Sequence, residues 1–429
     1  MDQTYLDKRI SRILEAGASP TVTGEYLHWD DLRRRKPPEG LTLDEWWLGI
    51  KLARANLARP FPLEDQFGRS FSYCPTDEGL RILHWIDVHA AGEILVNEQI
   101  PEPADRSRYL VSSLIEEAIT SSQLEGATST RRVAKEMLRS GRAPRDRSER
   151  MILNNYRAMT RIKGFASQPL TPGLVSDLHR ILTEQTLDDP AGAGRPQRPG
   201  EVRVGVYDPE GQLVHEPPPA EQLPDRMEAM CRFANEESGQ TFVHPVVRAI
   251  LLHLWLAYDH PFEDGNGRTA RAIFYWSMLH SGYWMFEYVS ISRILNAAPA
   301  RYARSFLYTE TDERDATYFV VDELSVIRRA IDELMDYLGR KMREARQTVG
   351  LLRQTTLNHR QVALLTHALR HADAEYTVTS HSTSHRVTRQ SARTDLLDLE
   401  RRGLLMRRQV GKRFVFAPVA NLGARVADS

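Results

Sequence analysis

The chain has 429 residues, enough for two or three domains with a substantial core. Its 57 basic and 57 acidic residues balance, which gives no overall attraction to nucleic acid or to a membrane surface. Two cysteines exclude a disulfide framework, and the sequence shows neither a signal peptide nor a run of about 18 apolar residues, the length that spans a membrane. We therefore expect a soluble cytoplasmic protein without a membrane partner.

Residues 1–105 are predicted to form an N-terminal helical extension that packs on the main domain. Apolar residues recur with helical spacing over 43–58 and 77–91, and a strand-like stretch over 67–74 lies between them. We find no group of residues in this part that carries chemistry of its own.

Residues 106–126 follow as an amphipathic helix, because apolar residues recur there at spacings of three and four. The helix ends in Glu125 and Gly126. A carboxylate is unfavourable beside the negative end of a helix dipole. Glu125 therefore either has a basic partner elsewhere in the fold or is simply exposed to solvent.

Residues 188–220 are rich in glycine and proline, and they contain a predicted hairpin. Alternation along 201–207 indicates a strand that pairs with 212–215 across the turn at Asp208–Gly211. This strand would place three valines on one side: Val202, Val204 and Val206. An uncovered hairpin edge could bind a target segment by strand addition, and an ordinary surface hairpin fits the sequence equally well.

The stretch His260–Arg271, HPFEDGNGRTAR, joins two long apolar segments that we expect to be buried helices. Gly265 and Gly267 allow successive backbone N–H groups to face one concavity, a nest that binds anions. The second helix, expected from about Arg268, would add its positive N-terminal end to the same concavity.

Four side chains of this stretch fit a phosphate site. Arg268 and Arg271 are three residues apart, on one face of the helix, so both could contact an anion. Asp264 offers an oxygen ligand for a Mg²⁺ shared with phosphate oxygens. His260, with an ordinary pKa of about 6.5, could accept a proton from a hydroxyl. Together they predict a polyphosphate site with a general base beside it.

This stretch resembles the signature of the Fic family, HxFx(D/E)GNGRxxR, and meets every defined position. The resemblance covers about residues 106–340 and implies a mainly α-helical Fic core with a β-hairpin flap that docks the modified side chain. It implies AMPylation: transfer of AMP from ATP, with Mg²⁺, to a Ser, Thr or Tyr hydroxyl of a target protein, or of the chain itself, with release of pyrophosphate.

The resemblance also implies residue roles. His260 would be the general base, and Asp264 would hold Mg²⁺ between the α- and β-phosphates. The nucleotide phosphates would contact Gly265, Asn266, Gly267, Arg268 (β-phosphate) and Arg271 (γ-phosphate). Tyr302 is a candidate for the adenine pocket, although Ala303 follows it where family members often have a second tyrosine. Core packing is an equally good interpretation of Tyr302.

Upstream, Ser121-x-x-x-Glu125-Gly126 is similar to the (S/T)xxxE(G/N) inhibitory motif of Fic proteins. In that family the glutamate pairs with the second arginine of the signature, here Arg271, and stops the γ-phosphate from binding productively. The resemblance thus implies an enzyme that Glu125 autoinhibits.

A charged linking helix at 341–355 precedes a separate domain at 356–429, whose predicted order of three helices and a hairpin is similar to a winged helix-turn-helix. Between residues 386 and 413 there are nine basic and three acidic residues, an excess expected for contacts with DNA phosphates. The outward face of the third helix carries the candidate contacts: Arg389, Gln390, Arg393 and Thr394. Protein contacts alone are the alternative use of such a domain.

Two other functions stay open at this stage. One is a transcriptional regulator, in which the Fic core senses nucleotide and the winged helix acts. The other is the reverse reaction, removal of AMP, in which Glu125 would orient the attacking water. The target protein and a homodimeric state are also open.

Overall fold

The computed structural model describes residues 10–427, apart from 14, 18, 92–102, 208–210, 237–241, 355–356, 372–373 and 411–412. The chain divides into two compact units, residues 1–334 and residues 335–429. Most of the described residues are helical, with three short two-stranded sheets, so the predicted mainly α-helical fold class is confirmed. No helix among the described residues is long and apolar enough to cross a membrane.

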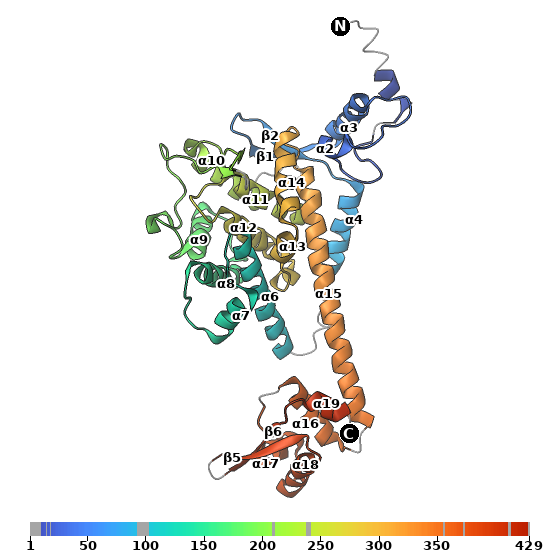
Figure 1. Ribbon diagram of the computed structural model, residues 1–429, viewed down its shortest axis with the longest axis vertical. Helices are drawn as coiled ribbons and strands as arrows, with labels where there is room; N and C mark the ends of the chain where they lie inside the picture. Colours follow the sequence, from blue (N-terminus) through green and yellow to red (C-terminus); the bar gives the residue numbers. More distant parts are fainter. Residues whose placement is uncertain are drawn as a thin grey trace. The chain divides into compact units, whose positions relative to one another are not determined.

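Two helices, α11 (Pro245–Asp259) and α12 (Asn266–His280), form the centre of the first unit (Figure 1). Nearly every residue of both helices is buried, because neighbouring helices cover every face. This accounts for two sequences that are apolar almost all round. The neighbours of this pair are α6 (Pro103–Leu124), α8 (Arg147–Phe165), α9 (Pro172–Thr183) and α10 (Leu223–Ala234).

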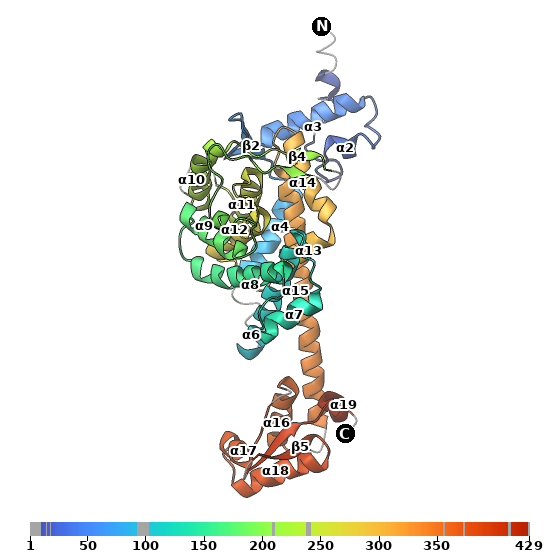
Figure 2. The same ribbon diagram turned by 60° about the vertical axis from the view of Figure 1, so that its left-hand side comes forward.

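Helices α6, α7 (Arg131–Ser140) and α8 lie side by side at one end of this bundle (Figures 1 and 2). Their contact is a small apolar cluster to which α6 contributes Ile115, Ala118 and Ile119. These residues belong to the apolar residues at spacings of three and four in the sequence. The spacing therefore correctly predicted which face of α6 packs against its neighbours.

The N-terminal part packs on the core through α14 (Pro299–Thr311) and the first turns of α15 (Thr317–Gln354). Lys51 Nζ donates to Asp312 Oδ1 at 2.8 Å, and Arg54 Nη1 donates to the Tyr318 hydroxyl at 2.7 Å. The elements of this part are α2 (Trp29–Leu32), α3 (Leu43–Leu57), β1 (Arg59–Glu64), β2 (Ser70–Tyr73), α4 (Asp77–Ile86) and the π-helical turn η1 (Asp87–Ala91).

One strand of this part, β1, was missed in the sequence. It pairs antiparallel with β2, which lies within the predicted strand-like stretch. Pro60 and Pro62 argue against a strand in any sequence-based reading. They are tolerated because β1 is at the edge of a two-stranded sheet and needs few backbone donors.

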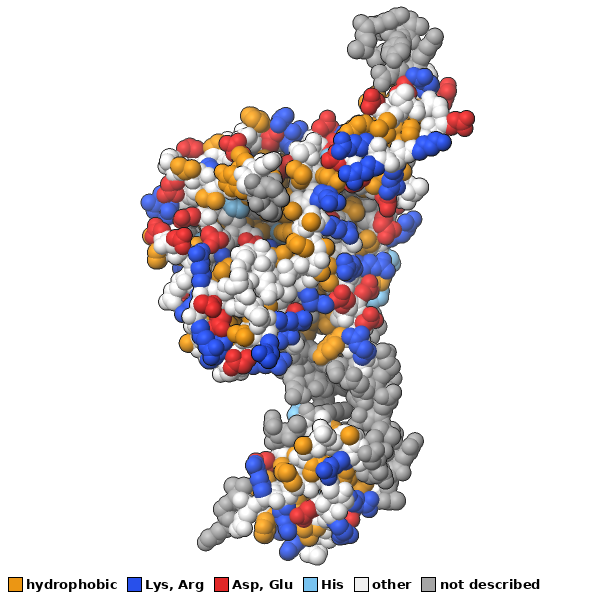
Figure 3. Space-filling view, viewed as in Figure 1, with side chains coloured by type: hydrophobic (Ala, Val, Ile, Leu, Met, Phe, Trp, Pro, Cys, Tyr) orange, Lys and Arg blue, Asp and Glu red, His pale blue; other side chains and the backbone are white. Residues whose placement is uncertain are grey.

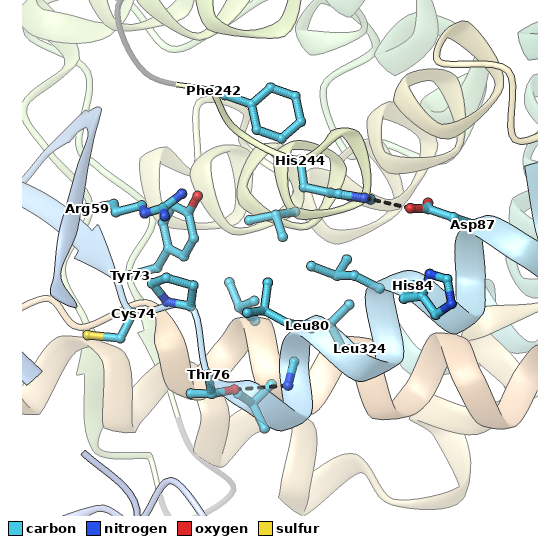
Figure 4. Close-up of a pocket in the computed structure, with 16 residues that line it drawn as sticks. Arg59, Tyr73, Cys74, Thr76, Leu80, His84, Asp87, Phe242, His244 and Leu324 are labelled. Carbon is cyan, nitrogen blue, oxygen red and sulfur yellow. Dashed lines mark hydrogen bonds and ion pairs between the residues drawn. The ribbon is translucent and has the colours of Figure 1, made fainter. Parts of the chain in front are cut away.

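A cavity of about 270 Å³ lies where α4, the start of α11 and α15 meet (Figure 4). Leu80, Val247 and Leu324 line it, and an ion pair between Asp87 and His244, 3.0 Å long, closes one side. On the face of the first unit that Figure 3 shows, basic and acidic side chains are interspersed, as the balanced composition requires.

The rest of the first unit follows α12 or joins α9 to α10. These elements are η2 (Pro190–Gly192), β3 (Val206–Tyr207), β4 (Leu213–His215), η3 (Ala220–Gln222), η4 (Trp284–Glu287) and α13 (Ile291–Ala297). Helix α15 continues through residues 341–354 of the predicted linker.

The second unit has three helices followed by an antiparallel hairpin and a short last helix. Its elements are α16 (His359–Arg370), α17 (Val378–His385), α18 (Arg389–Arg401), β5 (Leu405–Val410), β6 (Arg413–Pro418) and α19 (Leu422–Ala427). The core includes Leu364, Leu396 and Phe416. On α18 the candidate contact residues are all exposed: Arg389, Gln390, Arg393 and Thr394.

Candidate active site

The loop between α11 and α12 begins with His260, which has left-handed backbone angles (φ 45°, ψ 52°). Its N–H still donates to Leu256 O at 3.0 Å, so this residue both closes α11 and turns the chain. Burial and, to a smaller extent, the nearby His215 lower the pKa of His260 to about 4. The imidazole is therefore neutral at pH 7 and can accept a proton.

Asn266 locks this loop. Its Oδ1 accepts from Phe262 N–H at 2.9 Å, and its Nδ2 donates to Phe262 O at 2.7 Å. Both polar atoms of the amide side chain thus have a partner within the loop. The predicted contact of Asn266 with phosphate is left to its backbone N–H, which belongs to the first turn of α12.

Helix α12 starts at Asn266, two residues earlier than the sequence predicted, because Gly265 caps it with a left-handed backbone (φ 85°). A β-carbon on Gly265 would lie 2.7 Å from Thr183 Cγ2, so only glycine fits. The N–H groups of the first turn keep no partner within the helix, and the helix dipole adds positive potential there. An anion would be stabilised at this point.

The two arginines of the helix are buried, each with 1% of its surface exposed. Arg268 Nη1 donates to Leu182 O at 3.1 Å, and its Nη2 lies 3.4 Å from Asp264 Oδ1. Burial lowers the pKa of Arg268, but a guanidinium keeps its proton at neutral pH. Two fixed positive charges thus lie one turn inside the positive end of α12.

Asp264 is the acidic side chain of the loop that the sequence predicted to hold a metal ion. Its carboxylate is 40% exposed and lies 3.4 Å from Arg147 Nη2. Among the described residues, no group of three His, Cys, Asp or Glu side chains is arranged to bind a metal. A Mg²⁺ at Asp264 would therefore need phosphate oxygens as its other ligands, which fits the predicted site.

A residue that the sequence did not single out, His179 of α9, holds Asp264 in place. Its Nδ1 accepts the N–H of Gly194 at 2.8 Å, so Nε2 carries the proton and donates to Asp264 O at 2.8 Å. The ring stacks on Phe262, with centroids 3.7 Å apart. Burial lowers the pKa of His179 to about 4 and favours this neutral form. A single histidine on an apolar helix gave no sequence signal.

Arg271 is bound to the end of α6. Its Nε donates to Ser121 Oγ at 2.9 Å, and its Nη2 donates to Ser121 O at 3.0 Å and to Glu125 Oε1 at 2.9 Å. Helix α6 ends at Leu124, and Gly126 then takes a left-handed backbone (φ 86°). The expected pairing of Glu125 with Arg271 is therefore present.

The Glu125 carboxylate also covers the first turn of α12. A β-carbon on Gly267 would lie only 2.1 Å from Glu125 Oε1, so the carboxylate rests against the glycine backbone. Its side chain is 25% exposed. A carboxylate of this chain thus occupies the position that the helix end makes favourable for an anion.

The predicted seven-residue strand of the flap, residues 201–207, is wrong in length, because β3 covers Val206–Tyr207 alone. Only Val206 and Tyr207 pair with β4, whereas Val202 and Val204 precede the strand and are exposed. The three valines therefore do not share one strand face. Most of the predicted turn, residues 208–210, lies outside the described residues.

Arg203 explains the short strand. Its Nη2 donates to Asp259 O at 2.5 Å and to His260 O at 3.1 Å, and its Nε donates to Pro218 O at 2.7 Å. The backbone around Arg203 follows these contacts instead of an extended ladder. Arg203 thereby links the flap to the backbone of His260, which sequence reasoning missed.

Tyr302 of α14 has polar and aromatic partners in the core. Its hydroxyl lies 2.8 Å from His253 Nε2, and its ring packs edge-on against Phe306, with centroids 5.1 Å apart. The Arg271 guanidinium lies near enough to lower the Tyr302 pKa against the larger rise that burial causes. These contacts agree with the core-packing interpretation of Tyr302.

Comparison with known proteins gives a partial match. Residues 169–278 match the Fic/DOC family. Over 109 residues the chain is 40% identical to protein adenylyltransferase fic-1 of Caenorhabditis elegans and 35% identical to protein adenylyltransferase Fic of Drosophila melanogaster. These alignments cover 25% of this chain and 19% and 20% of the two relatives. The chain thus spans about a fifth of the length of the relatives it matches.

A solved structure has the same fold over a longer range. The chain resembles a Fic family protein from Desulfovibrio desulfuricans G20 with a TM-score of 0.56 and 20% sequence identity. The match covers 81% of this chain and 98% of that one. The family match and the related sequences agree with the loop geometry above: residues 169–278 match the Fic/DOC family, and the fold resembles that of a Fic family protein.

Proposed function

We propose that the protein transfers AMP from ATP to the hydroxyl of a Ser, Thr or Tyr side chain on a target protein, or on itself. The observation that carries this proposal is a neutral His260 beside a helix end with two buried arginines. The match to the Fic/DOC family and to relatives named protein adenylyltransferases supports it.

In the proposed reaction His260 accepts the proton of the attacking hydroxyl, whose oxygen forms a bond to the α-phosphorus. The bond from the α-phosphorus to the bridging oxygen breaks, and pyrophosphate leaves. The backbone N–H groups of Gly265, Asn266 and Gly267 bind the α- and β-phosphates, Arg268 the β-phosphate and Arg271 the γ-phosphate. Such fixed donors stabilise charge that develops during transfer.

Mg²⁺ belongs to this proposal through Asp264, whose exposed carboxylate is a suitable oxygen ligand. When bound, the ion would neutralise phosphate charge and orient the leaving group. His179 binds the backbone oxygen of Asp264, and Arg268 pairs with its carboxylate, so both hold Asp264 in position.

We further propose that Glu125 inhibits the reaction. Glu125 occupies two groups that the phosphates would need, because it binds Arg271 and covers the first turn of α12. ATP would have to displace this carboxylate before its γ-phosphate could contact Arg271. Ser121 would support the inhibited state through its two contacts with the same guanidinium, and Gly126 would allow the turn that aims Glu125.

For the flap, we propose that Val202, Val204 and Val206 contact the target segment. Val202 is 88% exposed and the pairing edge beyond β3 is short, so side-chain contacts would contribute more than strand addition. The anchor at Arg203 keeps this surface next to His260.

For the second unit, we propose a winged-helix domain within 356–429 that binds DNA, after a linker at 341–355. The order of helices and hairpin supports it, as do four exposed side chains of α18: Arg389, Gln390, Arg393 and Thr394. We divide the remaining residues of the chain into an N-terminal extension (1–105) and a Fic core (106–340).

Both cysteines are buried without a disulfide among the described residues, which fits a reducing cytoplasm.

The proposed reaction is tested by label transfer from α-labelled ATP with Mg²⁺ in a cell lysate. We expect a labelled protein band that strengthens with Glu125→Gly and disappears with His260→Ala. Absence of label with every variant, despite ATP binding, would contradict the transferase proposal. It would favour removal of AMP, or a nucleotide-sensing regulator that acts through the second unit.

A further inference from the structure

Beside Arg271 lies a chain of polar side chains, two fully buried and one half-buried, that the proposed reaction does not use. It consists of His253 from α11, Tyr302 from α14 and Glu323 from α15. The side chains of His253 and Glu323 are both 0% exposed. Polar groups are costly in such surroundings unless they are hydrogen-bonded.

The three groups follow one another toward Arg271. His253 Nδ1 lies 4.0 Å from Glu323 Oε1, and His253 Nε2 lies 2.8 Å from the Tyr302 hydroxyl, which lies beside the Arg271 guanidinium. In the described part of the chain, His253 Nδ1 and both Glu323 oxygens have no hydrogen-bond partner, because 4.0 Å is longer than a hydrogen bond. The two buried side chains therefore interact with each other electrostatically.

The protonation states follow from burial. Burial raises the pKa of Glu323 well above its ordinary value, and burial together with the nearby Arg271 lowers the pKa of His253 to about 3. Both shifts favour the neutral forms, in which Glu323 carries one O–H donor and His253 one N–H donor. With the ring proton on Nε2, that N–H donates to the Tyr302 oxygen, and Nδ1 faces the Glu323 acid as an acceptor.

The contacts of Arg271 show where this chain acts. Its Nε and Nη2 donate to Ser121 and Glu125, both at the end of α6. Nη1 takes no part in those contacts, and the Tyr302 oxygen is an acceptor on the α14 side. If Glu125 leaves, Arg271 loses a partner on one side and keeps Tyr302 on the other.

We propose that Glu323, His253 and Tyr302 are positioning residues that hold the Arg271 guanidinium in place for the γ-phosphate once Glu125 has moved away. This inference rests on the proposed function, which assigns the γ-phosphate to Arg271. It implies that the chain sets the preference for ATP over ADP, because ADP has no γ-phosphate for Arg271 to bind.

The test measures the affinity of the full chain for ATP and for ADP, with Mg²⁺, in a His260→Ala/Glu125→Gly parent that cannot turn over. Three changes each interrupt the chain: His253→Phe, Tyr302→Phe and Glu323→Leu. We expect each to weaken ATP binding roughly tenfold, the loss of one hydrogen bond to a charged group, and to leave ADP binding within about twofold. Glu323→Gln is the matched control, because its amide N–H replaces the acid O–H as donor and should keep ATP affinity.

Tyr302→Phe removes a single oxygen, so it stays informative if a change at His253 or Glu323 prevents folding. Unchanged ATP affinity in folded variants would overturn the inference, and so would equal losses for ATP and ADP, or a Glu323→Gln variant as weak as Glu323→Leu. A parent that already binds ATP and ADP equally would overturn the γ-phosphate assignment of Arg271, and this inference with it. Failure of AMP transfer by Glu125→Gly with intact ATP preference would instead contradict the proposed reaction alone.

Discussion

The loop from His260 to Arg268 and the end of α6 meet at the same site but are built differently. The loop is fixed in part by its own residues, through the two hydrogen bonds between Asn266 and Phe262, four positions apart. The end of α6 is fixed by Arg271, 146 positions after Glu125 and 150 after Ser121. Chemistry is thus encoded in contiguous residues, whereas the contact proposed to control it depends on distant ones.

The first test of this difference between the loop and the end of α6 removes the proposed base within the loop. We expect His260→Ala, in a Glu125→Gly background, to lower the rate of AMP transfer by about 10²- to 10⁴-fold, the usual contribution of a general base. ATP affinity should change little, because His260 contacts no phosphate in the proposed reaction. A transfer rate within twofold of the parent would contradict the assignment.

Loop stability is tested by Asn266→Ala. The change leaves Phe262 N–H and C=O buried without their partners, which should lower the free energy of unfolding by about 2–4 kcal/mol. Denaturant unfolding measures this loss. Glu263→Ala, at the exposed neighbour, is the control and should stay within about 0.5 kcal/mol. Equal stability of both variants would show that the loop is not held by its own residues.

At the end of α6, Glu125→Gly should raise the rate of AMP transfer about 10- to 100-fold. The reason is that the ion pair of Glu125 with Arg271 competes with the γ-phosphate, and its loss should strengthen productive ATP binding by about the same factor. Initial rates at limiting ATP measure the effect. Glu116 of the same helix binds Arg131, away from the site. The control Glu116→Gln should therefore leave the rate unchanged. If both variants are as slow as wild type, α6 does not control the site.

The pH dependence sharpens the difference between His260 and an ordinary histidine. Protonated imidazole cannot accept the hydroxyl proton, so kcat/KM should fall as pH falls through the His260 pKa of about 4. At pH 5.5 the Glu125→Gly variant should keep nearly all of its activity. A base with an ordinary pKa of about 6.5 would have lost about tenfold there, and that result would contradict the buried, neutral His260.

The smallest expected effect concerns the second unit. Arg393→Ala should weaken duplex DNA binding and reduce the slope of log affinity against log salt concentration by about one phosphate contact. Fluorescence anisotropy across salt concentrations measures the slope. Arg360→Ala is unsuitable as a control, because Arg360 binds buried Asp395 and supports the fold. No binding by the intact chain would dispose of the DNA proposal.

Local patterns predicted the central helices, the loop and the outward face of α18, because each depends on residues close together in the chain. They failed where distant contacts override propensity. Arg203 shortens the flap strand through Asp259 and His260, and β1 contains two prolines that only an edge strand tolerates. His179 was missed because its partners lie on other segments.

The bond from Arg271 to Ser121 O gives this site an uneven tolerance to mutation. Every amino acid supplies a backbone carbonyl, so no replacement at position 121 removes that acceptor as long as α6 keeps its course. Position 125 has no such reserve, because its contact is made by the side chain alone. Random substitutions would therefore relieve the proposed inhibition far more readily at position 125 than at position 121. A single substitution there would be enough to make the proposed activity constitutive.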